Sequence, residues 1–208
     1  MIFDHLAART LAGLTRLVTG VRANWVDHRP GAEVPQRVYF ANHSSHLDSL
    51  VIWASLPAAL RARTRPVAAA DYWDRPGLRR WLALRVLNAL AVKRAGGAGS
   101  REALHCLIAA LDDGDSLILF PEGTRGEGRQ IGRLRAGLYH VARQRPQIEL
   151  VPVFLDNLSR ILPKGECLPV PLIGSVRFGP PIRLQPDENR TVFLERARNT
   201  LIDLGCQR

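Results

Sequence analysis

The sequence predicts a single-domain α/β fold in which strands alternate with helices along the chain. Short β-prone apolar runs, such as 37–40 and 116–120, alternate with segments whose apolar residues recur every three or four positions. The 208 residues are 46% hydrophobic, with no compositional break between two parts, and they are enough for one sizeable core. We therefore expect an α/β sandwich.

The first 35 residues are expected to form an N-terminal helix and a linker, ahead of a domain that spans 36–208. Apolar residues recur at helical spacing from Phe3 to Trp25, which predicts an amphipathic helix of about 20 residues. This helix either packs on the core or lies in a membrane interface, with its arginines towards phospholipid headgroups. The apolar stripe consists of Phe3, Leu6, Ala7, Leu14, Leu17, Val18, Val21 and Trp25, and Arg9, Arg16 and Arg22 lie mostly off it.

A polar cluster at 41–48 follows the apolar run 37–40 and precedes a segment with helical spacing. A strand is therefore expected to end where the cluster begins, and a helix to start inside it. Strand ends of this kind are where α/β folds place their chemistry. On one regular helix His43 and Asp48 would lie about 140° apart. They can meet only if His43 precedes the helix and Asp48 lies in its first turns.

If these two side chains meet, they form a general base and its orienting carboxylate. A neutral imidazole such as that of His43 can take a proton from a hydroxyl, and a carboxylate on its other nitrogen fixes the tautomer and stabilises the imidazolium. The competing interpretation is structural, because Ser45 and Asp48 have the spacing of a capping box, and Ser44 and Ser45 are good N-cap residues. Spacing alone favours the capping box.

A second predicted strand, 116–120, ends in a glycine-containing turn. Pro121 closes this strand because proline cannot donate a hydrogen bond to a neighbouring strand. Gly123 permits a backbone conformation that other residues avoid. Thr124 and Arg125 follow in an exposed turn, where a planar guanidinium suits a phosphate. An ordinary strand–turn–helix corner accounts for this segment equally well.

The remaining periodicity predicts further strands and helices in alternation. Pro152 lies within one predicted strand, which suggests that this strand is at an edge of the sheet or contains a bulge. We expect helices at 78–87, 101–112, 134–144 and 191–204, and strands at 67–70, 90–92, 148–155 and 175–178.

The formal net charge of +10 implies an anionic partner, which can be nucleic acid, a phospholipid surface or a phosphorylated substrate. Seven arginines between positions 61 and 85 form either a solvated face or an anion- or membrane-binding patch. The three cysteines have no CxxC spacing, so they indicate neither a zinc site nor a disulfide framework, and they fit a reducing compartment. The sequence has no apolar run approaching the roughly 20 residues of a membrane span, and its start does not make a signal peptide.

Three motifs occur in order along the chain: N-H-x4-D at 42–48, F-P-E-G-T-R at 120–125 and V-P-V at 151–153. Together they resemble the first, third and fourth motifs of the glycerolipid acyltransferase family typified by 1-acyl-glycerol-3-phosphate acyltransferases. The family's second motif ends in arginine, and 92–94 occupies its place. This motif usually begins with glycine, where the chain has Asn88. Because this region shapes the acceptor site in the family, the departure leaves the acceptor's identity open.

The resemblance implies a glycerol-phosphate acyltransferase-like α/β sandwich with a mixed sheet. It also implies acyl transfer from acyl-CoA or acyl-carrier protein to the hydroxyl of a lysophospholipid. The first expected acceptor is 1-acyl-glycerol-3-phosphate, which would give phosphatidic acid. His43 would be the general base and Asp48 its orienting group, so that no serine nucleophile is required. No metal or cofactor is expected.

The resemblance assigns the substrate contacts to the other motif residues. Arg94 and Arg125 would clamp the acceptor phosphate, with Arg135 assisting in place of the family's usual lysine. Glu122 would hold the motif turn or contact the glycerol. Backbone N–H groups near the helix start after Asn42, or near Gly123, are the expected oxyanion donors. Gly123 and Thr124 would shape the pocket.

Because the products of such an enzyme are lipids, we expect peripheral binding to an anionic membrane at its cytoplasmic face, through the N-terminal helix. Other acceptors remain open, namely glycerol-3-phosphate, another lysophospholipid or a lyso-aminolipid. Two rival functions are a basic nucleic-acid-binding protein and a membrane-binding protein without activity. The aromatic content of 6% and the lack of a nucleic-acid motif count against the first. The intact pair of His43 and Asp48 counts against the second.

Overall fold

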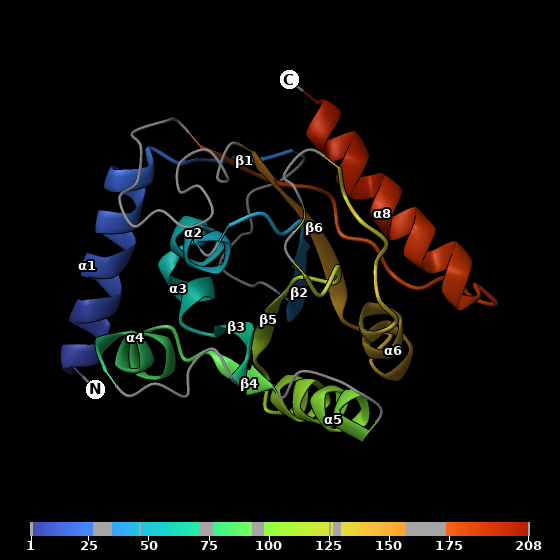
Figure 1. The fold of residues 1–208 in the computed structure, drawn as a ribbon, viewed down its shortest axis with the longest axis horizontal. Coiled ribbons are helices and arrows are strands. Elements are labelled where there is room, and N and C mark those ends of the chain that lie inside the picture. Colours follow the sequence, from blue (N-terminus) through green and yellow to red (C-terminus); the bar gives the residue numbers. More distant parts are fainter. Residues whose placement is uncertain are drawn as a thin grey trace.

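The described residues form one mixed sheet of seven strands in the order β1-β7-β6-β2-β5-β3-β4, with helices on both faces (Figure 1). The computed structural model describes residues 2–26, 35–45, 47–70, 77–92, 98–124, 126, 130–156 and 174–207. The strands are β1 (Arg22–Trp25), β2 (Arg37–Ala41), β3 (Thr64–Ala69), β4 (Leu90–Val92), β5 (Ser116–Leu119), β6 (Glu149–Asp156) and β7 (Ser175–Phe178). The helices are α1 (Ile2–Thr19), α2 (Asp48–Ser55), α3 (Ala58–Arg61), α4 (Leu78–Trp81), the π-helix η2 (Leu82–Val86), α5 (Ala98–Asp112), α6 (Gly137–Gln144) and α8 (Arg190–Cys206).

The predicted single-domain α/β fold with a mixed sheet is confirmed. Strands β6 and β7 pair antiparallel, whereas the other neighbouring strands pair parallel. Successive side chains of the central strand β2 point to opposite faces of the sheet. Tyr39 and Ala41 accordingly belong to one apolar cluster, and Val38 and Phe40 belong to the other. The first cluster lies under α1, α2 and η2, and the second lies under α5, α6 and α8. The sheet is therefore the middle layer of three.

The central strand β2 is flanked by β5 and β6, both parallel to it. All five of its residues are buried, as expected of a parallel strand covered on both faces. The register pairs Phe40 of β2 with Leu119 of β5. The chain consequently leaves these two strands side by side, at the edge of the sheet formed by their carboxyl ends. This arrangement brings together the two polar segments that follow them.

The N-terminal helix is shorter than predicted. It ends at Thr19, where Gly20 takes a left-handed φ of 56°, a conformation that commonly terminates helices. The next residues form the edge strand β1, which pairs parallel with β7. The Trp25 ring stacks on Phe178, with ring centroids 3.9 Å apart. The predicted stripe therefore extends beyond the helix, because pairing within the sheet overrides the local apolar periodicity at Trp25.

The prediction of an edge position or a bulge for the strand containing Pro152 is also wrong, because β6 lies between β2 and β7. The carbonyl of Pro152 accepts a hydrogen bond from Gly179 N, on the side of β7. In an extended strand the amide nitrogen of the same residue faces the same side. The pairing between β6 and β7 begins at Val153, which lies opposite Phe178, the last residue of β7. Pro152 therefore lies beyond the end of β7, and its missing N–H removes no hydrogen bond between the two strands.

The predicted helix at 78–87 divides into α4 and the π-helix η2. After it, Asn88 takes a positive φ of 49°, and its carbonyl accepts a hydrogen bond from Arg65 Nε at 2.9 Å. Asparagine is the residue other than glycine that most readily adopts the left-handed conformation. The departure from the family's glycine at this position therefore leaves the backbone conformation accessible.

We expect Asn88→Ala to lower the free energy of unfolding by about 1–2 kcal/mol, because alanine pays the steric cost of the left-handed conformation. Asn88→Gly should be close to the unsubstituted protein, since glycine has no Cβ. Urea denaturation of the three proteins measures this difference. Equal midpoints for Asn88→Ala and Asn88→Gly would contradict the backbone explanation.

Candidate active site

The structure brings His43 and Asp48 together as the base-and-carboxylate interpretation requires. His43 lies in the turn between β2 and α2, and Asp48 is the first residue of α2. The imidazole Nδ1 lies 2.9 Å from Asp48 Oδ2. The Asp48 side chain is fully buried, whereas that of His43 is 23% exposed. A buried carboxylate thus supports a base that remains accessible from solvent.

One oxygen of Asp48 carries all of its observed hydrogen bonds. Besides the imidazole, Oδ2 accepts the backbone N–H groups of Ser44 at 2.6 Å and Ser45 at 2.8 Å. Oδ1 is buried, and no protein donor in the described part of the chain reaches it. The bond from Ser45 N is the half of a capping box that involves the acidic side chain. The geometry is therefore compatible with both interpretations of Asp48, since its carboxylate caps the amide of Ser45 and contacts the His43 ring.

The other half of the capping box does not form. Leu47 occupies the N-cap position of α2 and makes no side-chain cap, so neither Ser44 nor Ser45 is the N-cap that we predicted. Ser45 Oγ instead accepts a hydrogen bond from Leu47 N at 3.3 Å. Asp48 N donates to the carbonyl of Ser45 rather than to its hydroxyl. The turn is consequently organised by the Asp48 carboxylate.

The contact with Asp48 sets the protonation pattern of the imidazole. Because Oδ2 is an acceptor, Nδ1 carries the proton in neutral His43, which leaves Nε2 with a free lone pair. Nε2 can therefore receive a proton from a substrate hydroxyl, and the carboxylate then stabilises the resulting imidazolium. This arrangement is that of a general base.

The turn after β5 lies directly against this pair. The Phe120 ring stacks on the His43 imidazole, with centroids 4.3 Å apart and planes 25° from parallel. Glu122 is buried, and both of its carboxylate oxygens accept backbone N–H groups, Oε1 from His43 and Oε2 from Gly132, each at 2.9 Å. Of the two roles expected for Glu122, these bonds support holding the turn rather than contacting a glycerol.

Gly123 occupies a position that a larger residue would fill. Its φ is 74°, and a Cβ there would collide with the side chain of Arg135. Arg135 lies just before α6, where its Nε donates to the Glu122 carbonyl at 3.1 Å and its backbone N donates to Pro121 O at 2.8 Å. Arg135 is an exposed residue beside this turn. Thr124 is exposed at the same turn.

Two of the predicted phosphate-binding residues, Arg94 and Arg125, lie outside the described residues. The expected oxyanion donors are largely occupied. The N–H groups of Ser44 and Ser45 donate to Asp48, and Gly123 N donates to Phe120 O. Among the described amides of this turn, those of Glu122 and Thr124 donate to no other described residue.

Sequence reasoning assigned no role to two motif residues that build the site. Asn42 is buried, and its side chain exchanges two hydrogen bonds with the backbone of Leu155, at 3.0 and 2.8 Å. These bonds tie the end of β2 to β6. Phe120 contacts the base itself. Both residues belong to the family motifs, and that membership was the available signal for them.

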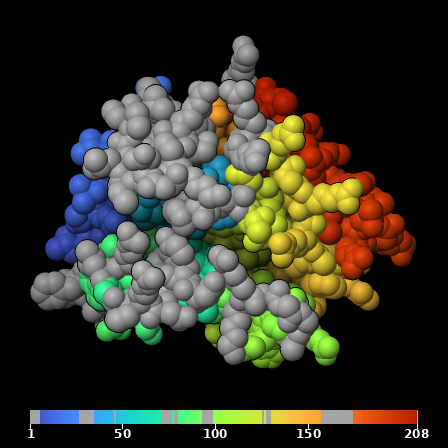
Figure 2. Space-filling model, in the orientation of Figure 1, coloured from blue at the N-terminus to red at the C-terminus, as the bar shows by residue number. Residues whose placement is uncertain are grey.

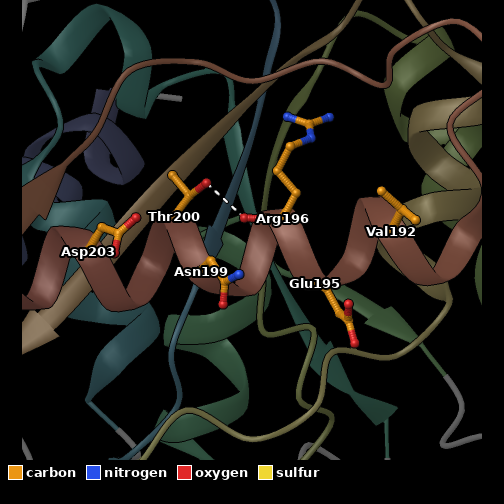
Figure 3. A pocket seen from close by; sticks show the side chains of 6 residues that line it. All are labelled: Val192, Glu195, Arg196, Asn199, Thr200 and Asp203. Atoms are coloured by element: carbon orange, nitrogen blue, oxygen red, sulfur yellow. Dashed lines mark hydrogen bonds between the residues drawn. The ribbon is translucent and has the colours of Figure 1, made fainter.

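Two surface hollows in the described part of the chain lie away from these residues. One, of about 360 Å³, runs along the outer face of α8, and all six of its lining side chains come from that helix (Figure 3). The hydroxyl of Thr200 in this hollow donates to the Arg196 carbonyl of the same helix. A second hollow, of about 520 Å³, lies around 181–186 and also includes Arg196. Neither contains a residue predicted for the site.

Comparison with known proteins gives the context of this geometry. A family model described as Acyltransferase matches residues 30–156. The chain is 24% identical over 164 residues to the chloroplastic 1-acyl-sn-glycerol-3-phosphate acyltransferase LPAT1 of Arabidopsis thaliana, covering 78% of this chain and 44% of that protein. It is also 24% identical over 140 residues to the chloroplastic 1-acyl-sn-glycerol-3-phosphate acyltransferase BAT2 of Brassica napus, covering 67% of this chain and 38% of that protein. The chain thus spans less than half the length of these relatives.

The fold is also that of a solved structure. The crystal structure of the 1-acyl-sn-glycerophosphate acyltransferase PlsC from Thermotoga maritima superposes with a TM-score of 0.72, covering 96% of this chain and 77% of that one. The identity between the two is 18%, so this likeness concerns the fold. The family model covers more than half of the chain and includes both polar turns at the end of the sheet. The chain therefore belongs to the acyltransferase family.

Proposed function

We propose that this protein transfers a fatty acyl chain from acyl-CoA or acyl-carrier protein to the hydroxyl of 1-acyl-glycerol-3-phosphate, giving phosphatidic acid. The observation that carries the proposal is the hydrogen-bonded pair of His43 and Asp48, held against the Phe120–Thr124 turn. The similarity to two plant 1-acyl-sn-glycerol-3-phosphate acyltransferases supports the choice of acceptor. Other lysophospholipids, glycerol-3-phosphate and lyso-aminolipids are the alternatives that the experiment must separate.

The mechanism follows from the orientation of His43. Nε2 takes the proton of the acceptor hydroxyl as its oxygen attacks the thioester carbonyl carbon. The C–S bond then breaks, and the leaving thiolate receives the proton from the imidazolium. The buried carboxylate of Asp48 stabilises the imidazolium between these two steps. A positioned general base of this kind contributes about 10²–10⁴-fold to the rate.

We assign the acceptor phosphate to arginines of the family motifs. Arg135 supports this assignment, because its Nε is fixed on the Glu122 carbonyl while the residue remains exposed. A guanidinium held at one nitrogen can still present its terminal N–H groups to a phosphate. Arg94 and Arg125 complete the proposed clamp, on the basis of their motif positions.

A panel assay tests the reaction. The purified protein is incubated with acyl-CoA or acyl-carrier protein and each candidate acceptor in turn, and the products are read by mass spectrometry. We expect phosphatidic acid from 1-acyl-glycerol-3-phosphate with at least one donor. A product from another acceptor alone would replace the proposed substrate. No acyl transfer to any acceptor would refute the proposed activity.

We also propose that the protein works as a peripheral enzyme at the cytoplasmic face of a membrane. Two faces of α1 support this proposal. One face packs against α2 and buries the small residues Ala12, Thr15 and Thr19. The opposite face leaves large apolar side chains in solvent, including Leu6 at 62% and Leu17 at 79% exposed. One face of α1 thus packs on the core of the protein, and the other face is available to a membrane interface.

The apolar exposure continues beyond α1 onto its neighbour. Helix α1 contacts η2, and Trp81 and Leu84 in the α4–η2 segment are also exposed. Figure 2 shows the α1 surface at one edge of the molecule, and α8 forms the opposite edge. Among the described helices, none has the length and apolarity needed to cross a bilayer. The protein is proposed to meet the membrane through the α1 and η2 surface.

The charge distribution also favours membrane contact through the N-terminal half of the chain, which contains α1 and η2. Residues 1–94 carry 14 Lys and Arg against six Asp and Glu, whereas residues 95–208 carry 15 against 13. Arg9 and Arg22 are exposed and available to headgroups. Arg16 was expected to face headgroups as well, but its Nε donates to the Ala54 carbonyl at 2.7 Å and Nη2 donates to Leu56 O at 3.4 Å. Arg16 therefore caps the end of α2.

We expect the double variant Leu6→Ser, Leu17→Ser to bind vesicles of anionic phospholipid roughly 100-fold more weakly. Each leucine that enters an apolar phase contributes about 1.5–3 kcal/mol, so the two together contribute at least about 3 kcal/mol, which corresponds to roughly 100-fold. Both side chains are exposed, so the fold should be unaffected. Liposome flotation measures the binding, with Val192→Ser on the exposed part of α8 as a matched control.

Point variants are preferable to deletion of the N-terminal segment. Removing α1 and β1 would also remove an edge strand, the stack of Trp25 on Phe178 and the cap that Arg16 forms on α2. A double variant that floats as well as the unsubstituted protein would refute the role of α1. Binding that persists but is released by high salt would transfer that role to the basic residues alone.

A further inference from the structure

The general base is fixed by contacts from both polar turns, not by Asp48 alone. Asp48 holds the imidazole at Nδ1, and Phe120 covers one face of the ring. The backbone of His43 is held as well, because its N–H donates to Glu122 Oε1 and its carbonyl accepts from Gly126 N, each at 2.9 Å. Three of these four contacts come from residues after β5.

The Phe120 ring, stacked on the imidazole, restrains the rotation of the His43 ring that the hydrogen bond to Asp48 still permits. A single hydrogen bond at Nδ1 leaves the imidazole free to pivot about that bond, which would move Nε2 away from the substrate hydroxyl. The phenyl ring lies 4.3 Å away and nearly parallel to the imidazole, so it blocks the pivot on that side. A ring fixed in this way also presents its negative π face to the imidazolium that forms during transfer.

Glu122 acts on the backbone at the same point. Its buried carboxylate bridges the amide of His43, in the turn after β2, and the amide of Gly132, in the segment leading to α6. Both oxygens are used, and both bonds are charge-assisted. Gly132 is in turn held from the other side by Arg198 Nε of α8, which donates to its carbonyl at 3.2 Å. The position of His43 is therefore tied to elements on the far side of the sheet.

We propose that Phe120 and Glu122 are positioning residues for the general base: Phe120 fixes the plane of the His43 ring, and Glu122 fixes the backbone from which that ring projects. The inference rests on the proposed role of His43. It gives this part of the F-P-E-G-T-R segment a function that is separate from phosphate binding. The requirement is physical, because a displacement of about 1 Å from the reactive geometry can cost about 100-fold in rate.

The Phe120 half is tested with Phe120→Leu and Phe120→Tyr. We expect Phe120→Leu to lower kcat by about 10- to 100-fold, with the KM values of both substrates changed less than about twofold, because the leucine keeps the apolar volume but not the flat restraint. Phe120→Tyr should restore most of the activity. Phe154→Leu is the matched control, since this half-buried phenylalanine lies on β6 and makes no ring contact with His43.

A spectroscopic readout separates positioning from a merely structural effect. Ring-current shielding by Phe120 should move the His43 ring-proton resonances upfield, and these resonances are identified by their loss in His43→Ala. They should move downfield in Phe120→Leu and stay in place in Phe120→Tyr and Phe154→Leu. A general loss of structure would instead disturb resonances throughout the protein.

The Glu122 half is tested with Glu122→Gln. The amide supplies one oxygen acceptor where the carboxylate supplies two, so its NH₂ group must face the N–H of either His43 or Gly132. We expect kcat to fall at least about tenfold, with the acceptor KM nearly constant. Glu188→Gln is the control, because Glu188 also has a nearly buried carboxylate with N–H donors, on Arg196 and Gln185.

The outcomes distinguish this inference from the proposed function. If His43→Ala is inactive while Phe120→Leu keeps full kcat and unshifted His43 resonances, positioning by the ring is refuted and the base remains. If Glu122→Gln raises the acceptor KM at constant kcat, Glu122 contacts the substrate and its positioning role is refuted. If His43→Ala itself stays active, the proposed mechanism fails, whatever the Phe120 variants do.

Discussion

His43→Ala is expected to lower kcat by about 10²–10⁴-fold while the protein stays folded. The loss follows from the removal of the group whose Nε2 is proposed to take the proton of the acceptor hydroxyl. The fold should persist because the imidazole is part-exposed, and its described contacts are Asp48 Oδ2 and the Phe120 ring. The bonds from Ser44 and Ser45 to the buried carboxylate remain in place.

The measurement is steady-state acyl transfer with saturating donor, together with a denaturation curve for each protein. His105→Ala is a suitable control, because His105 lies exposed on α5, away from the site. A His43→Ala protein with a normal denaturation curve and nearly full turnover would exclude His43 as the base. A variant that fails to fold would instead be replaced by His43→Gln, which keeps much of the side-chain volume.

Asp48→Asn is expected to cause the second large loss of activity, and the geometry predicts which interaction is lost. Two backbone N–H groups, from Ser44 and Ser45, converge on Oδ2. The asparagine oxygen must therefore occupy that site, with its NH₂ at the Oδ1 site. Nδ1 of His43 still finds an acceptor, so the productive tautomer is kept. What disappears is the negative charge that stabilises the imidazolium.

The loss of a charge-assisted contact is worth about 1.5–3 kcal/mol, so kcat should fall roughly 10- to 150-fold for Asp48→Asn. Asp48→Ala should lose more, because it frees the imidazole and leaves the N–H groups of Ser44 and Ser45 without their acceptor. ¹⁵N spectra of the His43 ring report the tautomer directly. Protonation at Nε2 in Asp48→Asn would show that the amide has turned over and that this forecast is wrong.

The double variant His43→Ala, Asp48→Ala completes the comparison. Because the carboxylate acts through the imidazole, removing both should cost little more in kcat than removing His43 alone. Independent, multiplying losses would mean that Asp48 also stabilises the transition state by another route. The comparison requires equal folded fractions, which the denaturation curves provide.

Local sequence signals determined much of the fold. Apolar runs and breaker residues placed β4 and β7 at their observed positions, and β2, β5 and α8 to within a residue or two. The motif residues 42–48 and 120–125 pointed to the proposed site, since that chemistry depends on residue type and order. The separation of His43 and Asp48 also required His43 to precede the helix, as it does.

Only the tertiary structure decided the features that depend on neighbours distant in the chain. Trp25 continues a helical stripe in the sequence, yet pairing with β7 makes it part of a strand. Pro152 looked like an edge residue, because the sequence does not show that β7 ends beside its missing N–H. Glu122 binds the amide of His43, 79 positions earlier in the chain, and only the parallel register of β2 and β5 brings the two together. The type of each site residue can be read from the sequence, whereas its hydrogen-bond partners across the sheet depend on the order of the strands.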